Sequence, residues 1–246
     1  MNKIIDLHVH SNFSPDSNQE VSSYFKLANT ERIALTDHLD FEDIYMGCDV
    51  LPDHQGLTTE LQRCAKQYGK GYLVGIEVGY HPDHASRIID HLRDKHFDVI
   101  ILSFHQDGTH DYLSPPPGYK VDVDQYLKNI IHGLNNMPFA TTLGHLDFPF
   151  RVNKLDPQFF NSPLLVEVFK LLITNGIAME LNTRSMYQYR NEKFYRQLFT
   201  KYYNAGGRLV SLGSDAHRTA DYRFNFEDAL NFLSEIGDFE LINYRY

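Results

Sequence analysis

The chain has 246 residues, of which 42% are hydrophobic and 22% are charged, and its formal net charge is −9. This composition is typical of a globular protein with a sizeable core, and the length suits one α/β domain. The acidic balance argues against a general surface for nucleic acid. No apolar run reaches the length of a membrane span, and the first residues lack the pattern of a signal peptide.

Seven short apolar runs recur along the chain, with helical patterns between them. They cover residues 3–10, 32–38, 72–80, 98–105, 140–147, 176–183 and 208–217. Their nearly continuous apolar character predicts parallel strands that are covered on both faces. Strand followed by helix, repeated seven times, predicts an α/β fold, a closed or nearly closed (β/α)7 barrel. We expect one domain that spans residues 1–246.

Two of the intervening helices carry recognisable end signals. Residues 163–174, PLLVEVFKLLIT, follow Ser162 as an N-cap, have a proline at the first helical position and precede Gly176. Near the C-terminus, Asn225 or a neighbour precedes the stretch FEDALNFLSEI as a cap, and Gly237 follows that stretch as its stop.

A long loop interrupts the alternation at residues 106–120, QDGTHDYLSPPPGYK, which contain three consecutive prolines. A long loop after a barrel strand lies at the end of the barrel where active sites form. We therefore expect either a lid over the site or a surface excursion without a role.

Histidine and cysteine are used very differently in this chain. The two cysteines, Cys48 and Cys64, are too few and too far apart for a disulfide framework or a cysteine zinc site. We therefore expect a reducing, cytoplasmic setting. The 13 histidines are the compositional oddity. Two of them, His8 and His10, project from the same face of the first predicted strand, as ligands of a divalent metal ion would.

Side chains that bind metals recur where the predicted strands end. Six of the seven runs finish with His8, His10, Asp37, His38, Glu77, His105, His145, Asp215 or His217. Parallel barrel strands deliver such residues to one mouth, although any single one has an ordinary explanation as a hydrogen-bonded core residue. An unpaired buried carboxylate such as Glu77 is costly. Histidine, aspartate and glutamate without cysteine suit zinc, manganese or iron, and more than four ligands imply more than one ion.

The segments DLHVHS, LTDH, GIEVGY, SFH, GHLD and GSDAH follow one another in order across residues 6–217. This pattern resembles the PHP (polymerase and histidinol phosphatase) superfamily of metal-dependent phosphoesterases, a family of distorted seven-stranded barrels. The stretches HVHSNFSPDS, GIEVGY and GSDAHR are most similar to its histidinol-phosphate phosphatase branch. The resemblance implies two to three divalent metal ions in one site.

The resemblance also implies how the ligands are shared between the ions. The first metal would have His8, His10, Glu77 and Asp215, the second Glu77, His105 and His145, and the third Asp16, His38 and His217. Many members of the superfamily have histidine in place of Asp16. We expect Asp37, next to His38, to orient an imidazole.

The implied reaction is hydrolysis of L-histidinol phosphate to L-histidinol and phosphate, a step of histidine biosynthesis. A hydroxide between the first two metals would attack phosphorus, with Glu77, Asp215 and His217 as catalytic residues. His217 or a metal-bound water would protonate the leaving group. No phosphoenzyme is needed, because neither cysteine lies in a nucleophile-like motif.

Arginines after the last two predicted strands are candidates for binding phosphate, because a guanidinium pairs with two oxygens. Arg184 and Arg218 are well placed, although each is as readily a surface residue, and Arg151 and Arg190 are next in line. Relatives often have a loop of glycine and basic residues at the position where this chain has RSMYQYR. Because such loops usually determine the substrate, the sequence does not define the substrate pocket. We expect Asn182 to orient this strand end.

Other functions remain open on the sequence. If the protein is a phosphoesterase, its substrate could instead be another small phosphorylated metabolite or DNA. The acidic net charge disfavours DNA. Amidohydrolase chemistry uses a similar histidine set but bridges its metals with a modified lysine, where this chain has Glu77. A non-catalytic, metal-binding regulatory module is the alternative outside enzymes. The substrate, the identity of the metal and the oligomeric state are open.

Overall fold

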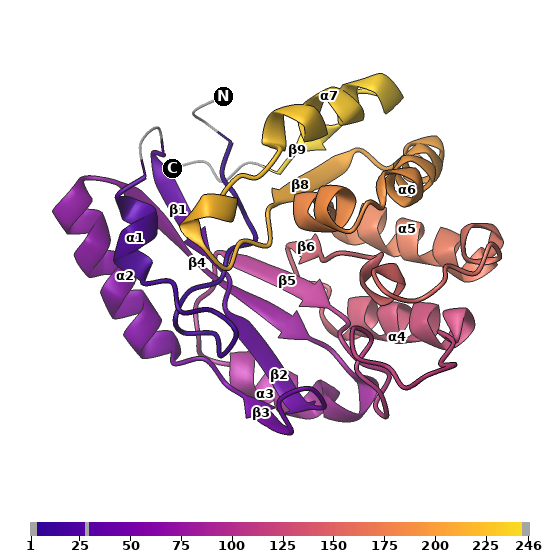
Figure 1. The fold of residues 1–246 in the computed structure, drawn as a ribbon, viewed down its shortest axis with the longest axis horizontal. Coiled ribbons are helices and arrows are strands. Elements are labelled where there is room, and N and C mark those ends of the chain that lie inside the picture. Colours follow the sequence, from indigo (N-terminus) through magenta and orange to yellow (C-terminus); the bar gives the residue numbers. More distant parts are fainter. Residues whose placement is uncertain (1–3, 28–29, 243–246) are drawn as a thin grey trace.

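The computed structural model describes residues 4–27 and 30–242 (Figure 1). Its strands are β1 (Arg32–Leu35), β2 (His38–Asp43), β3 (Cys48–Val50), β4 (Gly71–Gly79), β5 (Val99–Ser103), β6 (Thr142–Leu143), β7 (Ala178–Asn182), β8 (Leu209–Gly213) and β9 (Glu240–Leu241). They form one sheet in the order β3-β2-β4-β5-β6-β7-β8-β9, in which β1 also pairs with β4. Every pairing between these strands is parallel except the β2–β3 hairpin.

The predicted α/β class with a mostly parallel sheet is confirmed, but the strand count differs from seven. The described chain has nine strands. Six of the seven predicted runs contain a strand, and β2, β3 and β9 were not predicted. The first predicted run, 3–10, forms only a single bridge, between Val9 and Ala216, and its residue 3 lies outside the described residues.

Residues 7–10 nevertheless connect the region of β8 with the region of β1 through backbone hydrogen bonds. The Leu7 amide donates to the Leu212 carbonyl (3.1 Å) just below the end of β8, and the His10 amide donates to the Ala216 carbonyl (2.8 Å). On the other side, the Thr36 amide, next to β1, donates to the Val9 carbonyl (2.8 Å). The segment that carries both N-terminal histidines therefore lies between β8 and β1.

The helices lie outside the strands, with α1 and α2 on one side and α4, α5, α6 and α7 on the other (Figure 1). The α-helices are α1 (Val21–Phe25), α2 (His54–Tyr68), α3 (Ala85–Leu92), α4 (Val123–Asn136), α5 (Pro163–Asn175), α6 (Glu192–Asn204) and α7 (Phe226–Ile236). Short helical turns occupy Pro82–His84, Phe148–Phe150, Phe159–Asn161, Arg184–Gln188 and Thr219–Asp221. None of the described helices is long and apolar enough to cross a membrane.

The predicted helix ends are confirmed for α5 and only in part for α7. The Ser162 hydroxyl accepts from the Leu164 amide (3.3 Å), and Gly176 ends α5 with a positive φ of 66°. Helix α7 stops at Gly237 as predicted, but Asn225 makes no side-chain cap. Asn225 instead has a φ of 52°, a left-handed conformation that asparagine tolerates better than most residues.

The core has an outer layer and an inner layer. The largest apolar cluster packs side chains of α4, α5, α6 and α7 against the outer face of the strands. A smaller inner cluster consists of Leu7, Ala34, Leu73, Val99 and Ile101. Side chains two residues apart on a strand share a face. The inner face therefore continues from Leu73 to Glu77 on β4, and from Ile101 to Ser103 on β5, where apolar residues give way to polar ones.

Candidate metal centre

The polar end of the inner face gathers all nine predicted metal ligands. Their ligand atoms form four overlapping groups, within each of which all atoms lie within 4.8 Å of one another. The groups are His10–Asp16–His38–His217, His8–Glu77–His145, His8–His10–Asp215 and His38–Glu77–His105. These groups differ from the three predicted ligand sets. His10, predicted for the first metal, also lies with the ligands of the third, and His38, predicted for the third, also lies beside Glu77.

Glu77 lies at the centre of this cluster, with its two carboxylate oxygens facing different histidines. Its Oε2 lies 3.1 Å from His8 Nε2, 3.4 Å from His10 Nε2 and 3.2 Å from His38 Nδ1. Its Oε1 lies 2.8 Å from His145 Nε2 and 3.2 Å from His105 Nε2. Although burial opposes ionisation, the surrounding imidazoles hold the pKa of Glu77 well below its usual value. A carboxylate placed in this way can bridge two cations.

Several buried polar atoms of the cluster have no hydrogen-bond partner among the described residues. They include His8 Nε2, His10 Nε2, His38 Nδ1 and Glu77 Oε2. Leaving such an atom unsatisfied costs about 1–3 kcal/mol. The atoms converge on shared points, and imidazole with carboxylate is a donor set that zinc, manganese and iron accept. The cluster therefore fits divalent metal ions.

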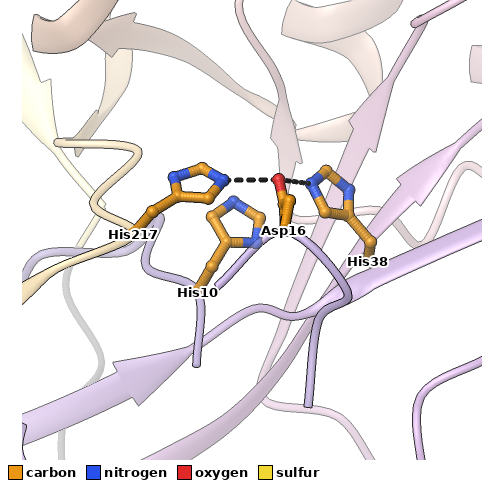
Figure 2. A group of neighbouring side chains, drawn as sticks. All are labelled: His10, Asp16, His38 and His217. Atoms are coloured by element: carbon orange, nitrogen blue, oxygen red, sulfur yellow. Dashed lines mark hydrogen bonds and ion pairs between the residues drawn. The ribbon is translucent and has the colours of Figure 1, made fainter. Parts of the chain in front are cut away.

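Asp16 faces three histidines at the outer edge of the cluster (Figure 2). Its Oδ2 lies 2.7 Å from His217 Nε2 and 3.5 Å from His38 Nε2. The His10 ring stacks between the rings of His38 and His217, with centroid distances of 4.4 Å and 4.3 Å. Partial burial opposes ionisation of Asp16, but hydrogen bonds from His217 and His38 hold the pKa of this carboxyl well below its usual value.

Serines hold the turn that carries Asp16. The Ser14 hydroxyl accepts from the His38 amide (2.9 Å), and the Ser17 hydroxyl donates to the His217 carbonyl (3.0 Å). These bonds tie the SPDS turn to the two segments that supply the neighbouring histidines, so the turn folds back over the mouth.

Two buried carboxylates that the sequence interpretation missed orient the imidazoles. Glu180 Oε1 lies 2.6 Å from His8 Nδ1, and its Oε2 accepts from the His145 amide (2.7 Å). Asp40 Oδ1 lies 2.8 Å from His105 Nδ1. A carboxylate on Nδ1 fixes the tautomer that leaves Nε2 free for a metal. The sequence does contain a feature that indicates Glu180: like Glu77, it is a carboxylate within an apolar run.

The prediction that Asp37 orients an imidazole is wrong. Asp37 accepts from the Ser11 amide (2.6 Å) and the Ser11 hydroxyl (2.8 Å) and contacts no imidazole through a hydrogen bond or ion pair. The reason is strand alternation, which turns Asp37 away from the face that carries His38 and Asp40. Asn182 was expected to orient the strand end, and its side-chain amide lies 3.4 Å from both Glu180 Oε2 and Asp215 Oδ2.

Two glycines leave room for these orienting carboxylates. A Cβ atom at Gly213 would overlap Glu180 Oε1, and a Cβ atom at Gly79 would overlap Asp40 Oδ1. Both glycines lie at the ends of strands, beside the histidine that the carboxylate holds. Any larger residue there would displace the carboxylate from its imidazole.

Of the four candidate arginines, Arg151 and Arg184 contact the cluster. The buried Arg151 guanidinium donates to Asp215 Oδ2 (3.1 Å), and Arg184 Nη1 donates to the Asp215 carbonyl (3.2 Å). His217 Nδ1 lies 2.9 Å from both Arg184 Nη1 and that carbonyl. Arg218, in contrast, is 73% exposed and pairs with Asp221 at 2.9 Å. The structure thus brings Arg184 to the cluster but not Arg218, and it adds Arg151.

A cleft of about 430 Å³ opens over the cluster. Its floor contains Glu77, His105, His145 and Asp215, and Arg151 and Arg184 border it. The β2–β3 hairpin and the 106–120 loop also contribute to its lining. Arg218 and Arg190 do not line this cleft. The 106–120 loop is therefore part of the site rather than a surface excursion.

The fold and the cluster together define an α/β protein with a candidate centre for divalent metal ions at the carboxyl ends of parallel strands. The PHP domain family matches residues 6–184, and the chain belongs to this family.

Named relatives cover almost the whole chain. Histidinol-phosphatase from Lactococcus lactis is 27% identical over 260 residues, which cover 98% of this chain and 94% of that protein. Probable histidinol-phosphatase from Thermotoga maritima is 27% identical over 237 residues, which cover 95% and 93%. The crystal structure of the Lactococcus lactis histidinol phosphate phosphatase, complexed with zinc, L-histidinol and phosphate, superposes with a TM-score of 0.83 at 24% identity. It covers 98% of this chain and 95% of that one.

Proposed function

We propose that this protein is a metal-dependent phosphomonoesterase that hydrolyses L-histidinol phosphate to L-histidinol and phosphate. The observation that carries the proposal is Glu77, whose two oxygens face separate sets of imidazoles beside buried nitrogens without hydrogen-bond partners. The names of the relatives specify the substrate, because each is called a histidinol-phosphatase or a probable one.

The cluster would hold two to three ions of zinc, manganese or iron. The proposed sets are His8, His10, Glu77 and Asp215 for the first ion, Glu77, His105 and His145 for the second, and Asp16, His38 and His217 for the third. When bound, such ions supply hydroxide at neutral pH and neutralise charge on the phosphoryl oxygens.

The side chains around the cluster would bind and orient the substrate. The guanidinium groups of Arg151 and Arg184 border the cleft and can donate to phosphoryl oxygens, as planar donors do in paired hydrogen bonds. The His217 imidazole faces the cleft with Asp16 at Nε2 and Arg184 at Nδ1. The leaving alcohol would take its proton from His217 Nε2 when the third ion is absent and this nitrogen carries a proton, and from water when His217 holds that ion.

The proposal includes one domain over residues 1–246 and a seven-membered barrel as its frame. Support for the barrel comes from residues 7–10, which bond to residues at the end of β8 and next to β1 and so close the ring of parallel strands. In this description β1 and β2 count as one member, because both pair with β4.

The decisive experiment is a turnover screen. Metal-free protein is loaded with zinc, manganese or iron and tested on L-histidinol phosphate and on other phosphorylated metabolites. We expect phosphate release from L-histidinol phosphate to be fastest, and we expect Glu77→Gln to abolish it. Faster phosphate release from another metabolite would identify that metabolite as the substrate instead. Metal binding without turnover of any phosphomonoester would identify a regulatory module.

A further inference from the structure

One part of the cleft lining is acidic and apolar. Asp43 ends β2, Asp111 belongs to the 106–120 loop, and both line the cleft together with Tyr45, Met46 and Leu113. The two cationic arginines border the same cleft beside Asp215. The cleft therefore contains arginines that can bind an anion, and it also contains two carboxylates beside apolar side chains.

Asp111 is a built-in feature of this part of the lining rather than a loose surface carboxylate. The residue is 8% exposed, and its Oδ1 accepts from the Leu113 amide (2.9 Å), the Ser114 amide (2.8 Å) and the Ser114 hydroxyl (2.9 Å). These bonds fix the orientation of the carboxylate and use one oxygen only. Within the described chain, no hydrogen bond or ion pair is recorded for Oδ2.

Gln106 fastens the loop to the hairpin, so this part of the lining is formed without substrate. Its Oε1 accepts from the Ile44 amide (2.9 Å), and its Nε2 donates to the Glu42 carbonyl (3.3 Å). Gln106 also forms an antiparallel bridge with Asp111, directly after His105 of the metal cluster. Asp111 is thereby held close to the metal centre.

Neither carboxylate is neutralised by the cleft itself. Asp43 and Asp111 form no ion pair with any arginine or histidine that lines it. Among the described hydrogen bonds, the Asp43 carboxylate accepts only from the Met46 amide (2.6 Å). Burial raises the pKa of Asp43, and repulsion from the carboxylates of Asp40 and Asp111 adds to this rise, whereas the Met46 amide and His105 lower it in part. A cation bound between Asp43 and Asp111 would relieve this repulsion.

We propose that Asp43 and Asp111 bind the protonated amine of the substrate's alcohol portion, while Tyr45, Met46 and Leu113 cover its apolar part. The protein thereby selects phosphomonoesters of amino alcohols over neutral ones. This inference rests on the proposed function and extends it to the residues that determine specificity. Tyr45 is 72% exposed and Met46 is 42% exposed, so both have apolar surface to offer to such a group.

The test compares L-histidinol phosphate with its deamino analogue, which keeps the imidazole and the phosphate but lacks the amine. For Asp111→Asn we expect kcat/KM for L-histidinol phosphate to fall about 30-fold, the lower end for a buried charge pair that loses one partner. For the half-buried Asp43→Asn we expect a fall of about tenfold. For the analogue, both variants should stay within about twofold of the unaltered protein.

Glu42→Gln is the matched control, because Glu42 lies on the same hairpin but is exposed and pairs with Arg87 at 2.9 Å. It should leave both substrates unaffected. Equal losses on both substrates in the aspartate variants, or no preference of the unaltered protein for the amine, would overturn the inference.

A second measurement separates this inference from the proposed function. If no metal-loaded form hydrolyses any phosphomonoester, the proposed function fails, but L-histidinol binding can still be measured by calorimetry. Binding that weakens in Asp111→Asn and not in Glu42→Gln would support the amine site. Binding that is absent, or that is unchanged in Asp111→Asn, would refute it.

Discussion

Replacing Glu180 with glutamine should weaken metal binding without changing the shape of the core. Both oxygens of Glu180 act as acceptors, one toward His8 Nδ1 (2.6 Å) and one from the His145 amide (2.7 Å). A glutamine has one oxygen and one NH2 group. Because the backbone amide of His145 can only donate, the oxygen must stay there and the NH2 group must face His8 Nδ1. His8 Nδ1 then has to accept, and its proton moves to Nε2.

The displaced proton occupies the nitrogen that faces Glu77 at 3.1 Å, where a metal would bind. Loss of a carboxylate partner of this kind typically lowers metal affinity by about 10–100-fold, or roughly 1.4–2.8 kcal/mol. Glutamine has nearly the same volume as glutamate, so no cavity adds to this effect. The assay is competition for zinc between the metal-free protein and a chromogenic chelator, with circular dichroism to check the fold.

Asp147→Asn is the control for loss of a buried carboxylate near the site. Asp147 is fully buried and accepts from the Tyr195 hydroxyl (2.7 Å) and the Asn191 amide (2.8 Å), but it contacts no imidazole through a hydrogen bond or ion pair. This variant should lose stability and keep its zinc affinity. A folded Glu180→Gln protein whose zinc affinity stays within about twofold of the unaltered protein would refute the tautomer argument.

Three further predictions address the ions, the phosphate and the protons of the site. His38→Ala should lower the metal content by about one ion per chain in elemental analysis while circular dichroism stays unchanged. Arg151→Ala and Arg184→Ala should each lower kcat/KM for a phosphomonoester by roughly 30-fold or more, whereas the exposed, already paired Arg218 should tolerate alanine with nearly full activity. Although burial lowers the pKa of His105, its two carboxylate neighbours raise it to about 10 in the metal-free protein. Metal binding at neutral pH should therefore release protons, and metal affinity should fall as the pH falls, which calorimetry in buffers of different ionisation enthalpy can measure.

The convergence of the cluster could be predicted because it depends on topology rather than on detail. Parallel strands bring their carboxyl ends to one mouth, whatever the exact strand boundaries are. Glu77, His105 and His145 therefore meet although β6 is only two residues long and ends before His145. The ends of α5 were equally predictable, since a serine cap and a terminal glycine act locally.

The arginines could not be assigned from the sequence, because their directions depend on short irregular segments. Arg184 begins the helical turn Arg184–Gln188, which directs it back to Asp215. Arg218 follows His217 with an extended backbone (φ −148°, ψ 149°) and pairs with Asp221 instead. Arg151 comes after a short turn, at a position without any motif, and only the tertiary structure reveals its contact with Asp215.

Asp215 links the metal centre to the arginines that border the cleft. Its Oδ1 lies 3.5 Å from His10 Nε2, on the side of the imidazoles, and its Oδ2 lies 3.1 Å from Arg151. Although burial opposes ionisation, Arg184, His8 and Arg151 hold the pKa of this carboxyl well below its usual value, so it carries a full charge. In the proposed metal centre, a cation that shared this charge would weaken its hold on the guanidinium groups and leave their donors free for an anion in the cleft. The same carboxylate would then both hold a metal ion and prepare the site for phosphate.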